Sequence, residues 1–275
     1  MKLKKNASFY INQLIDLIAQ PIVKAREQEK TPAFAQPEDE GFQDLPPDTD
    51  TSDDTQEPGL EVKKLDLSSR KLRFLPLEIQ KFTQVEQLNL EQNHLNILMS
   101  EIGAFLHLKR LDLRGNELES LPQEIGSLQC LEWLCVQNNR LVELPNTIGQ
   151  LHQLRWLWLN DNHLHSFPKG IVQLENLEWL NLQNNSLTKL PGEIEEMQGL
   201  IGLNLSGNRL KNVPTEIKQL RNLRELNLDS NQLTTLPKSI EQLQDLERLF
   251  LHHNYFSQSE LEKIQNWLPH CNICF

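Results

Sequence analysis

A strict 23-residue period organises most of this chain. Written in rows of 23 from Leu65, nine successive rows open with leucine and keep their register without an insertion. The opening residues are Leu65, Leu88, Leu111, Leu134, Leu157, Leu180, Leu203, Leu226 and Leu249. A fixed period of this length indicates supersecondary units that bury their apolar faces only against their neighbours. The sequence therefore predicts a stack of similar coils, that is, a solenoid.

Two local patterns within each row predict its conformation. The first and third positions are apolar, and this period of two is typical of a strand that points alternate residues inward. Identical rows place such strands side by side in a parallel sheet, roughly 4.8 Å apart. The twelfth position is proline in seven of the eight full rows, and a residue without a backbone N–H suits the start of a helical turn on the outer side.

The full pattern, L-x-L-x-x-N-x-L…L-P-x-x-I-x-x-L-x-x-L over residues 65–254, resembles that of the leucine-rich repeat family. The resemblance implies an α/β solenoid, a right-handed horseshoe with a parallel sheet on its concave face and short helical or 3-10 turns on its convex side. The ending, LPHCNICF, follows a short helical pattern that the capping-box pair Ser257 and Glu260 begins. This ending is similar to the terminal cap of short spirochaete-type bacterial proteins of the family.

Asparagine fills the sixth position of eight consecutive rows, and Arg70 fills it in the first row. The chain turns out of the strand here and carries polar backbone groups into the interior, where they need partners. A side-chain amide offers both donor and acceptor, so one stacked asparagine can bond the turns around it. We interpret the column as structural. Its members are Asn93, Asn116, Asn139, Asn162, Asn185, Asn208, Asn231 and Asn254.

The repeats divide the chain into four segments. Residues 1–30 form an amphipathic, helical N-terminal segment. Residues 31–60 are rich in proline and contain nine acidic residues but no lysine or arginine, which indicates a disordered linker. Residues 61–254 hold eight full repeats and a partial ninth. We interpret residues 255–275 as a C-terminal cap, because an open solenoid end exposes its core.

Apolar residues at helical spacing place the N-terminal helix over residues 8–23. Its flanking lysines suit contact with an anionic membrane surface, but docking as an N-terminal cap is the favoured interpretation. No apolar run reaches the roughly 18 residues that a membrane span needs. The opening residues also lack a clean signal-peptide cleavage site. We expect a cytoplasmic protein, with a secreted or surface location as the alternative.

Charge and motifs argue against several functions. The chain has 27 basic and 38 acidic residues, whereas nucleic-acid binding needs a basic excess. The sequence lacks a glycine-rich phosphate loop, a zinc-protease motif and a nucleophile elbow, so we expect no catalytic residues and no cofactor. Zinc-ligand residue types do gather near the end, at His252, His253, His270, Cys271 and Cys274. Because the two cysteines would face opposite ways on a strand, we expect a packed cap and no metal.

Tryptophans gather in the middle of the predicted concave face. The last position of each row precedes an inward leucine, so its side chain points outward onto that face, as does the second position. Trp133, Trp156 and Trp179 fill the last position of three consecutive rows, and Trp158 fills a second position beside Trp156. An aromatic patch with a polar rim, on a face that no core covers, is the usual form of a binding hot spot. A stiffening ladder of stacked indoles is the alternative.

We therefore expect a non-catalytic, monomeric module that binds a protein partner across these indoles. Family resemblance supports this expectation, because leucine-rich repeat proteins mostly act in protein recognition. Charged residues complete the expected contact surface: Glu91, Arg110 and Arg114 on one side, and Glu225, Asp229, Arg248 and His252 on the other. The alternative is a secreted or surface adhesin that binds carbohydrate, because indoles also stack on sugar rings.

Overall fold

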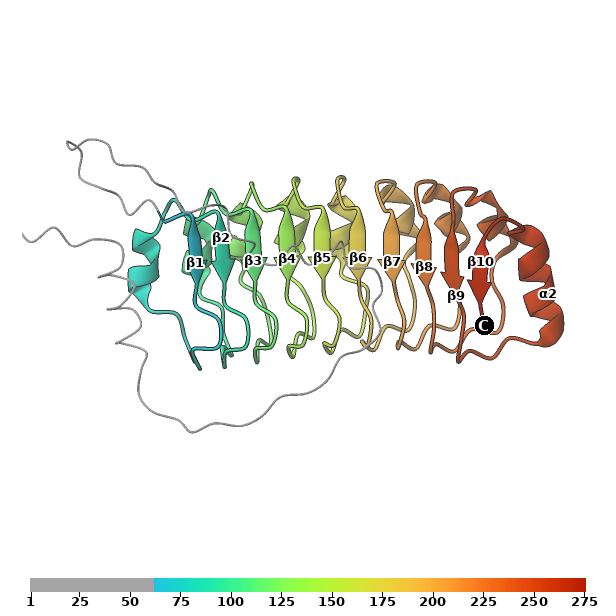
Figure 1. Ribbon diagram of the computed structural model, residues 1–275, viewed down its shortest axis with the longest axis horizontal. Coiled ribbons are helices and arrows are strands. Elements are labelled where there is room, and N and C mark those ends of the chain that lie inside the picture. The colour runs from blue at the N-terminus through green and yellow to red at the C-terminus, as the bar shows by residue number, and fades with distance from the viewer. Residues whose placement is uncertain (1–61) are drawn as a thin grey trace, which may run out of the picture.

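The computed structural model describes residues 62–275, so the segments predicted over residues 1–30 and 31–60 lie outside the described residues. The described chain forms one sheet of ten parallel strands in chain order (Figure 1). A short 3-10 turn follows each of the first eight strands and lies on the other side of the core from the sheet. The predicted solenoid fold is therefore confirmed. We call the sheet face that points away from the 3-10 turns the concave face.

Each strand is only three residues long, and the first nine begin 23 residues apart. They are β1 (Lys64–Asp66), β2 (Gln87–Asn89), β3 (Arg110–Asp112), β4 (Trp133–Cys135), β5 (Trp156–Trp158), β6 (Trp179–Asn181), β7 (Gly202–Asn204), β8 (Glu225–Asn227), β9 (Arg248–Phe250) and β10 (Asn272–Cys274). Equivalent residues pair directly across neighbouring strands, as Leu134 pairs with Leu157. The sequence period therefore sets the strand register.

The 3-10 turns are η1 (Leu77–Lys81), η2 (Ser100–Ala104), η3 (Gln123–Ser127), η4 (Asn146–Gln150), η5 (Lys169–Gln173), η6 (Gly192–Glu196), η7 (Thr215–Gln219) and η8 (Lys238–Gln242). The predicted prolines occupy the residue before the turn, where extended backbone suits their fixed φ. Met99 adopts almost the same conformation (φ −69°, ψ 152°) as Pro122 (φ −69°, ψ 155°). The neighbouring coils therefore impose this bend even where proline is absent.

The core lies between the sheet and the 3-10 turns. Inward strand residues such as Leu134 and Val136 are 0% exposed, as is Ile148 of η4, which faces them. Complete burial of one such side chain favours folding by about 1.5–3 kcal/mol. Because each coil presents the same apolar positions, the buried side chains form one continuous core along the solenoid.

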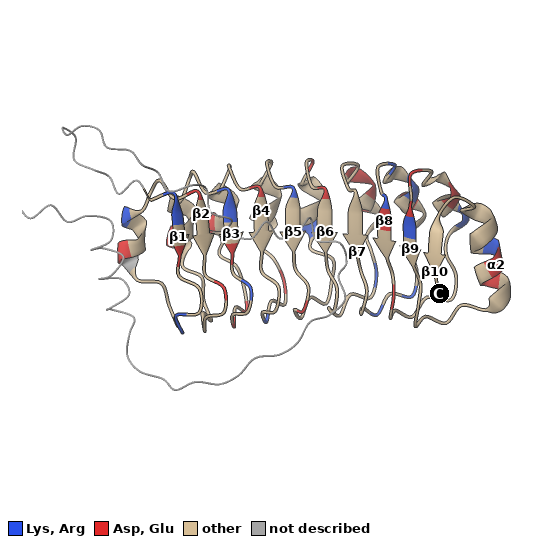
Figure 2. Cartoon of the chain, viewed as in Figure 1, with Lys and Arg blue, Asp and Glu red and all other residues tan. Residues whose placement is uncertain are grey.

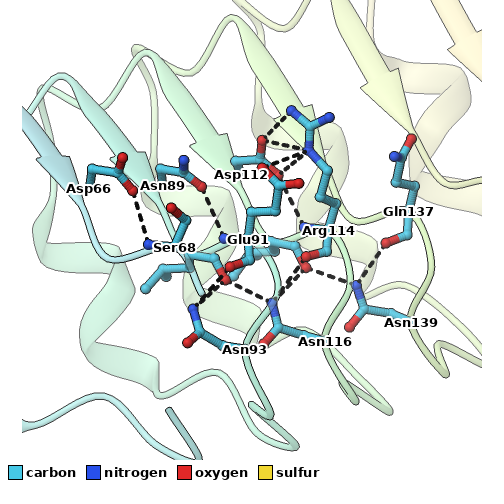
Figure 3. Close-up of polar contacts among 12 residues, drawn as sticks. Asp66, Ser68, Asn89, Glu91, Asn93, Asp112, Arg114, Asn116, Gln137 and Asn139 are labelled. Carbon is cyan, nitrogen blue, oxygen red and sulfur yellow. Dashed lines mark hydrogen bonds and ion pairs between the residues drawn. The ribbon is translucent and has the colours of Figure 1, made fainter. Parts of the chain in front are cut away.

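The asparagine column bonds successive coils to each other (Figure 3). Asn116 Nδ2 donates to the carbonyl of Leu90 in the preceding coil (2.9 Å) and to that of Leu113 in its own coil (3.0 Å). Its Oδ1 accepts the N–H of Leu95, also in the preceding coil (3.0 Å). The same three bonds recur at Asn93, Asn139 and the later members of the column. One amide thus satisfies three buried backbone groups, two of which belong to its neighbour.

The residue before the sixth position of every repeat lies in the left-handed region, whether an asparagine or Arg70 follows it. The positive φ angles run from 52° to 65° over Ser69, Gln92, Gly115, Asn138, Asp161, Asn184, Gly207, Ser230 and His253. This conformation lets the chain leave the strand and turn the asparagine inward. Glycine adopts it without steric cost, and Asn and Asp tolerate it better than most residues. These left-handed positions were not predicted from the sequence, although the Asn, Asp and Gly residues among them were a visible signal.

The C-terminal end of the solenoid is covered by α2 (Gln258–Trp267) and completed by β10, which pairs with β9. Ser257 caps α2, and its side chain accepts a hydrogen bond from the N–H of Glu260 at 3.3 Å. Ile264 and Leu268 pack into the core with exposed fractions of 0% and 5%. The last repeat therefore has a packed neighbour.

The bonds of the asparagine column predict a large difference between two neighbouring substitutions. Asn162→Ala removes the bonds to Val136 O, Leu159 O and Leu141 N–H, leaving buried backbone groups unpaired. We expect it to lower the free energy of unfolding by about 2–4 kcal/mol, measured by chemical denaturation. The control is Asn160→Ala, whose side-chain amide bonds only to exposed Asp161. We expect a change of about 0.5 kcal/mol or less for the control; equal losses would contradict a structural role specific to the column.

Candidate functional site

The last positions of the repeats form a continuous row across the concave face. Strand pairing sets the neighbours in this order: Arg110, Trp133, Trp156, Trp179, Gly202, Glu225 and Arg248. The three tryptophans are partly exposed and stand on adjacent strands β4, β5 and β6. We call Trp133, Trp156 and Trp179 the tryptophan row.

Arginine side chains stack on two indoles of the row. The guanidinium carbon of Arg110 lies 4.2 Å from the ring centroid of Trp133, and that of Arg155 lies 4.5 Å from the ring centroid of Trp156. The guanidinium carbon of Arg114 lies 6.0 Å from the ring centroid of Trp133. Cations over an indole face are attracted by its quadrupole, at about 0.5–1 kcal/mol at an exposed site. These contacts restrict the orientation of both rings while leaving part of each exposed.

The third indole, Trp179, lies against the backbone of the next strand. A β-carbon built on Gly202 would stand 2.1 Å from Cε3 and 2.2 Å from Cζ3 of Trp179. Only glycine leaves room for the ring at this position. The indole therefore extends over β7, and the tryptophan row covers a wider part of the sheet than its three strands.

The expectation that Trp158 shares the exposed patch is wrong, because only 3% of this residue is exposed. It pairs in register with Cys135, which is 2% exposed, and Asn181, which is 5% exposed. Second-position side chains stand between the last-position and fourth-position side chains on the same face. With strands this short, the flanking columns cover them. Trp158 supports the patch from below and has little surface to offer a partner.

The second position also carries a polar column that the sequence analysis missed (Figure 3). Asn89 Oδ1 accepts the N–H of Glu91 at 3.0 Å, and Asp112 Oδ1 accepts that of Arg114 at 3.1 Å. The same bond to the residue two positions later is made by Asp66, Asn181, Asn204 and Asn227. The Asn and Asp residues at this position were the signal, since both readily bond to a backbone N–H nearby.

On the β3 side, the predicted flanking residues form a compact charged cluster. Arg114 binds the buried carboxylate of Asp112, with Nη2 2.6 Å and Nε 2.8 Å from Oδ2. Its Nε also lies 3.7 Å from Glu91 Oε2. Arg110, stacked on Trp133, borders this cluster. The structure therefore brings Glu91, Arg110 and Arg114 together at one edge of the tryptophan row.

On the β8 side, the flanking residues form two pairs. Glu225 is 2% exposed and pairs with Arg248, whereas Asp229 Oδ1 accepts the backbone N–H of His252 at 2.6 Å. Burial raises the pKa of Glu225 above its ordinary value, and the charge of Arg248 only partly opposes this effect. Its burial leaves Glu225 little surface for a partner, so Arg248, Asp229 and His252 present most of this edge.

A column of alternating charge runs beside the tryptophan row, and it too was missed in the sequence. It consists of the residue immediately before the last position of each repeat: Lys63, Glu86, Lys109, Glu132, Arg155, Glu178, Ile201, Arg224 and Glu247. Lys109 Nζ lies 2.7 Å from Glu86, and Arg155 Nη2 lies 2.6 Å from Glu178. The bond from Lys109 lowers the pKa of Glu86. Arg155 thus joins the charged column to the indole of Trp156.

Comparison with known proteins agrees with the repeat geometry. The family model described as "Leucine-rich repeat region" matches residues 61–184 and 169–267. This chain is a leucine-rich repeat protein. A search of curated proteins gave no match.

Several solved structures are similar to this chain. A leucine-rich repeat protein of Leptospira interrogans is 39% identical, with a TM-score of 0.66, over 78% of this chain and 60% of that protein. The plant peptide hormone receptor RGFR1 in complex with RGF2 is 27% identical, with a TM-score of 0.56, over 73% and 37%. The TLR13–ssRNA13 complex is 28% identical, with a TM-score of 0.65, over 72% and 29%. This chain therefore spans less than two thirds of each of these proteins.

Other chemistry on the described residues is limited. Over residues 62–275, no three His, Cys, Asp or Glu side chains gather closely enough to hold a metal ion, and no helix is long and apolar enough to cross a membrane. Cys271, beside β10, and Cys274, within it, are half-buried and form no disulfide. A surface depression lies beside the starts of β1 to β4. It is lined by Lys63, Gln84, Glu86, His107, Lys109 and Cys130.

The contact between Trp179 and Gly202 predicts that a single methyl group moves the indole. In Gly202→Ala, the new β-carbon meets the ring at 2.1 Å, so Trp179 must leave the surface of β7. We expect a shift in tryptophan fluorescence that disappears in a Trp179→Phe background, and a stability loss of about 1–3 kcal/mol. Gly192→Ala is the matched control, because its β-carbon would meet nothing closer than 3.8 Å. Unchanged emission in Gly202→Ala would contradict the contact.

The raised pKa of buried Glu225 predicts a pH-dependent effect of Glu225→Gln. A carboxyl group with a raised pKa in the folded state contributes stability at low pH, and this contribution is lost as pH rises through the folded pKa. Glutamine does not titrate, so the variant's melting temperature should rise relative to wild type between about pH 4 and pH 8. Glu247→Gln, in an exposed pair with Arg224, is the control and should show little trend. A difference that falls with pH would contradict the assigned shift.

Proposed function

We propose that this protein acts by binding, and that a segment of a protein partner lies across the tryptophan row on the concave face. The observation that carries this proposal is the contiguous register of Trp133, Trp156 and Trp179 on a sheet face that no core covers. Interface hot spots are enriched in tryptophan and arginine, and both occur here in contact.

Restricted side chains support the same proposal. Arg110 and Arg155 stack on Trp133 and Trp156, and Gly202 leaves the space that Trp179 occupies. Trp158 is buried between the neighbouring columns. Because these side chains are already restricted, ordering them on binding costs less entropy than ordering freely rotating side chains would. The short strands add rigidity because equivalent residues are paired along the whole sheet. The patch is therefore preorganised for contact.

The charged edges suit the polar rim of an interface. Arg110, Arg114 and Glu91 border the row on one side, and Arg248, Asp229 and His252 border it on the other. Most of these groups already have partners within the chain, so we expect them to contribute to specificity and association rate more than to affinity. The indoles should dominate the binding free energy.

The relatives support a binding function in general terms. One is a receptor solved with a peptide hormone, and another was solved with single-stranded RNA. For this chain, 38 acidic against 27 basic residues favours a protein partner over a nucleic acid. We propose no catalytic role for any residue of the concave face.

Affinity capture with the full chain tests the proposed surface. The baits are wild type and the triple variant Trp133→Ala/Trp156→Ala/Trp179→Ala, presented to lysate of the source cell and of a candidate host. We expect a protein retained by wild type to bind the variant at least about 100-fold more weakly, since each hot-spot residue contributes about 2 kcal/mol or more. Titration of the purified partner measures this loss.

Two controls make the outcome specific. Trp267→Ala removes an indole from α2, outside the row, and should retain the partner. Circular dichroism must show that every bait is folded. If folded wild-type and triple-variant baits bind the purified partner equally, the tryptophan row is not the site. If the variant instead loses binding to an immobilised glycan, the row serves a carbohydrate and the protein-partner proposal fails.

A further inference from the structure

The first coil of the solenoid, residues 62–84, is basic, although the chain as a whole is acidic. It contains six basic residues and two acidic ones, Asp66 and Glu78. The basic residues are Lys63, Lys64, Arg70, Lys71, Arg73 and Lys81. They are spread around the coil, before β1, after it and on η1, and all except Lys64 are exposed. Figure 2 shows this concentration of Lys and Arg at the β1 end.

Two exposed apolar residues lie at the same end. Phe74 is 71% exposed and Ile97 is 70% exposed. They occupy the same position in adjacent repeats, 23 residues apart, so they are neighbours on the surface. The equivalent positions in the next two repeats are Ser120 and Glu143, so the apolar pair is confined to the β1 end. The surface at the β1 end thus combines positive charge with a small apolar patch.

The chain supplies a segment of opposite charge directly before this coil. Residues 31–60 contain nine acidic residues and no lysine or arginine, and they also contain Phe34, Phe42 and Leu45. Only Glu61 separates the segment from Val62. A segment tethered this closely has an effective concentration in the millimolar range, so individually weak charge pairs can hold it. Its composition complements both features of the first coil.

We propose that the acidic segment, residues 31–60, binds to the basic surface of the first coil within the same chain. The contact is separate from the tryptophan row. It gives the β1 end a cover, as α2 and β10 cover the other end. An exposed solenoid end otherwise leaves its terminal coil without a neighbour. The charges make this cover sensitive to ionic strength.

Carbodiimide cross-linking of the full chain tests the contact, because it joins carboxylates to lysine amines that touch. A mixture of unlabelled and ¹⁵N-labelled protein separates links within one chain from links between chains. We expect links within one chain from residues 38–44 to Lys71 and Lys81. They should fall about fivefold or more in Arg70→Glu/Arg73→Glu, which reverses two exposed charges of the first coil and retains its lysines.

The matched control is Arg209→Glu/Arg221→Glu, which makes the same charge change on exposed residues far from β1. This variant should keep the wild-type links. Amide hydrogen exchange gives a second measurement: residues 70–75 should exchange faster in Arg70→Glu/Arg73→Glu or at about 0.5 M salt, with unchanged exchange in β5 as evidence of a folded solenoid. Links that the first variant does not reduce, or links found only between chains, would overturn the proposal.

Discussion

Hydrogen bonds to buried backbone groups at the turn after each strand are the constraint on which the rest of this structure depends. A chain that coils every 23 residues must take polar groups through its own core. One asparagine in each coil after the first satisfies them, and two of its three bonds reach the preceding coil. The left-handed residue before each asparagine is the conformational cost of turning that amide inward. The hydrogen bonds that satisfy the buried backbone groups therefore also hold successive coils together.

The same stacking explains why the concave face can carry large aromatic side chains. The leucines behind the strands supply the core, so the outward positions are not needed for folding and can be chosen for contact. Their neighbours are fixed by register, which places Arg110 on Trp133 and Trp179 on Gly202. A regular scaffold thus holds an irregular surface, and the function proposed for this protein lies in that irregularity.

The fold was predictable because each of its rules repeats. Leucine alternation predicted the strands, proline the outer turns, and asparagine the buried bonds, and each pattern could be read many times over. Features that occur once were not predictable in this way. Burial of Trp158 depends on crowding by the neighbouring columns, and the fit of Trp179 over Gly202 depends on which way one ring turns.

The missed columns are a different case, because their residues were visible. Strand alternation places the second position on the outward face, but the bond from its Asn and Asp side chains to the backbone two residues later was not predicted. The charges beside the tryptophan row become meaningful only when residues 23 apart are known to touch. Sequence spacing showed which residues are equivalent, whereas the structure showed which atoms meet.

The alternating charges have a consequence for how such a chain can change in length. Loss of the single coil that carries Glu132 would bring Lys109 beside Arg155, and loss of the coil that carries Lys109 would bring Glu86 beside Glu132. From Lys63 to Glu178, removal or duplication of two adjacent coils together sets no like charges side by side. In this part of the column the heritable unit is a pair of repeats, although the backbone repeats with every coil. Ile201 is the uncharged member, so the coil that carries it could be gained or lost alone without setting like charges side by side.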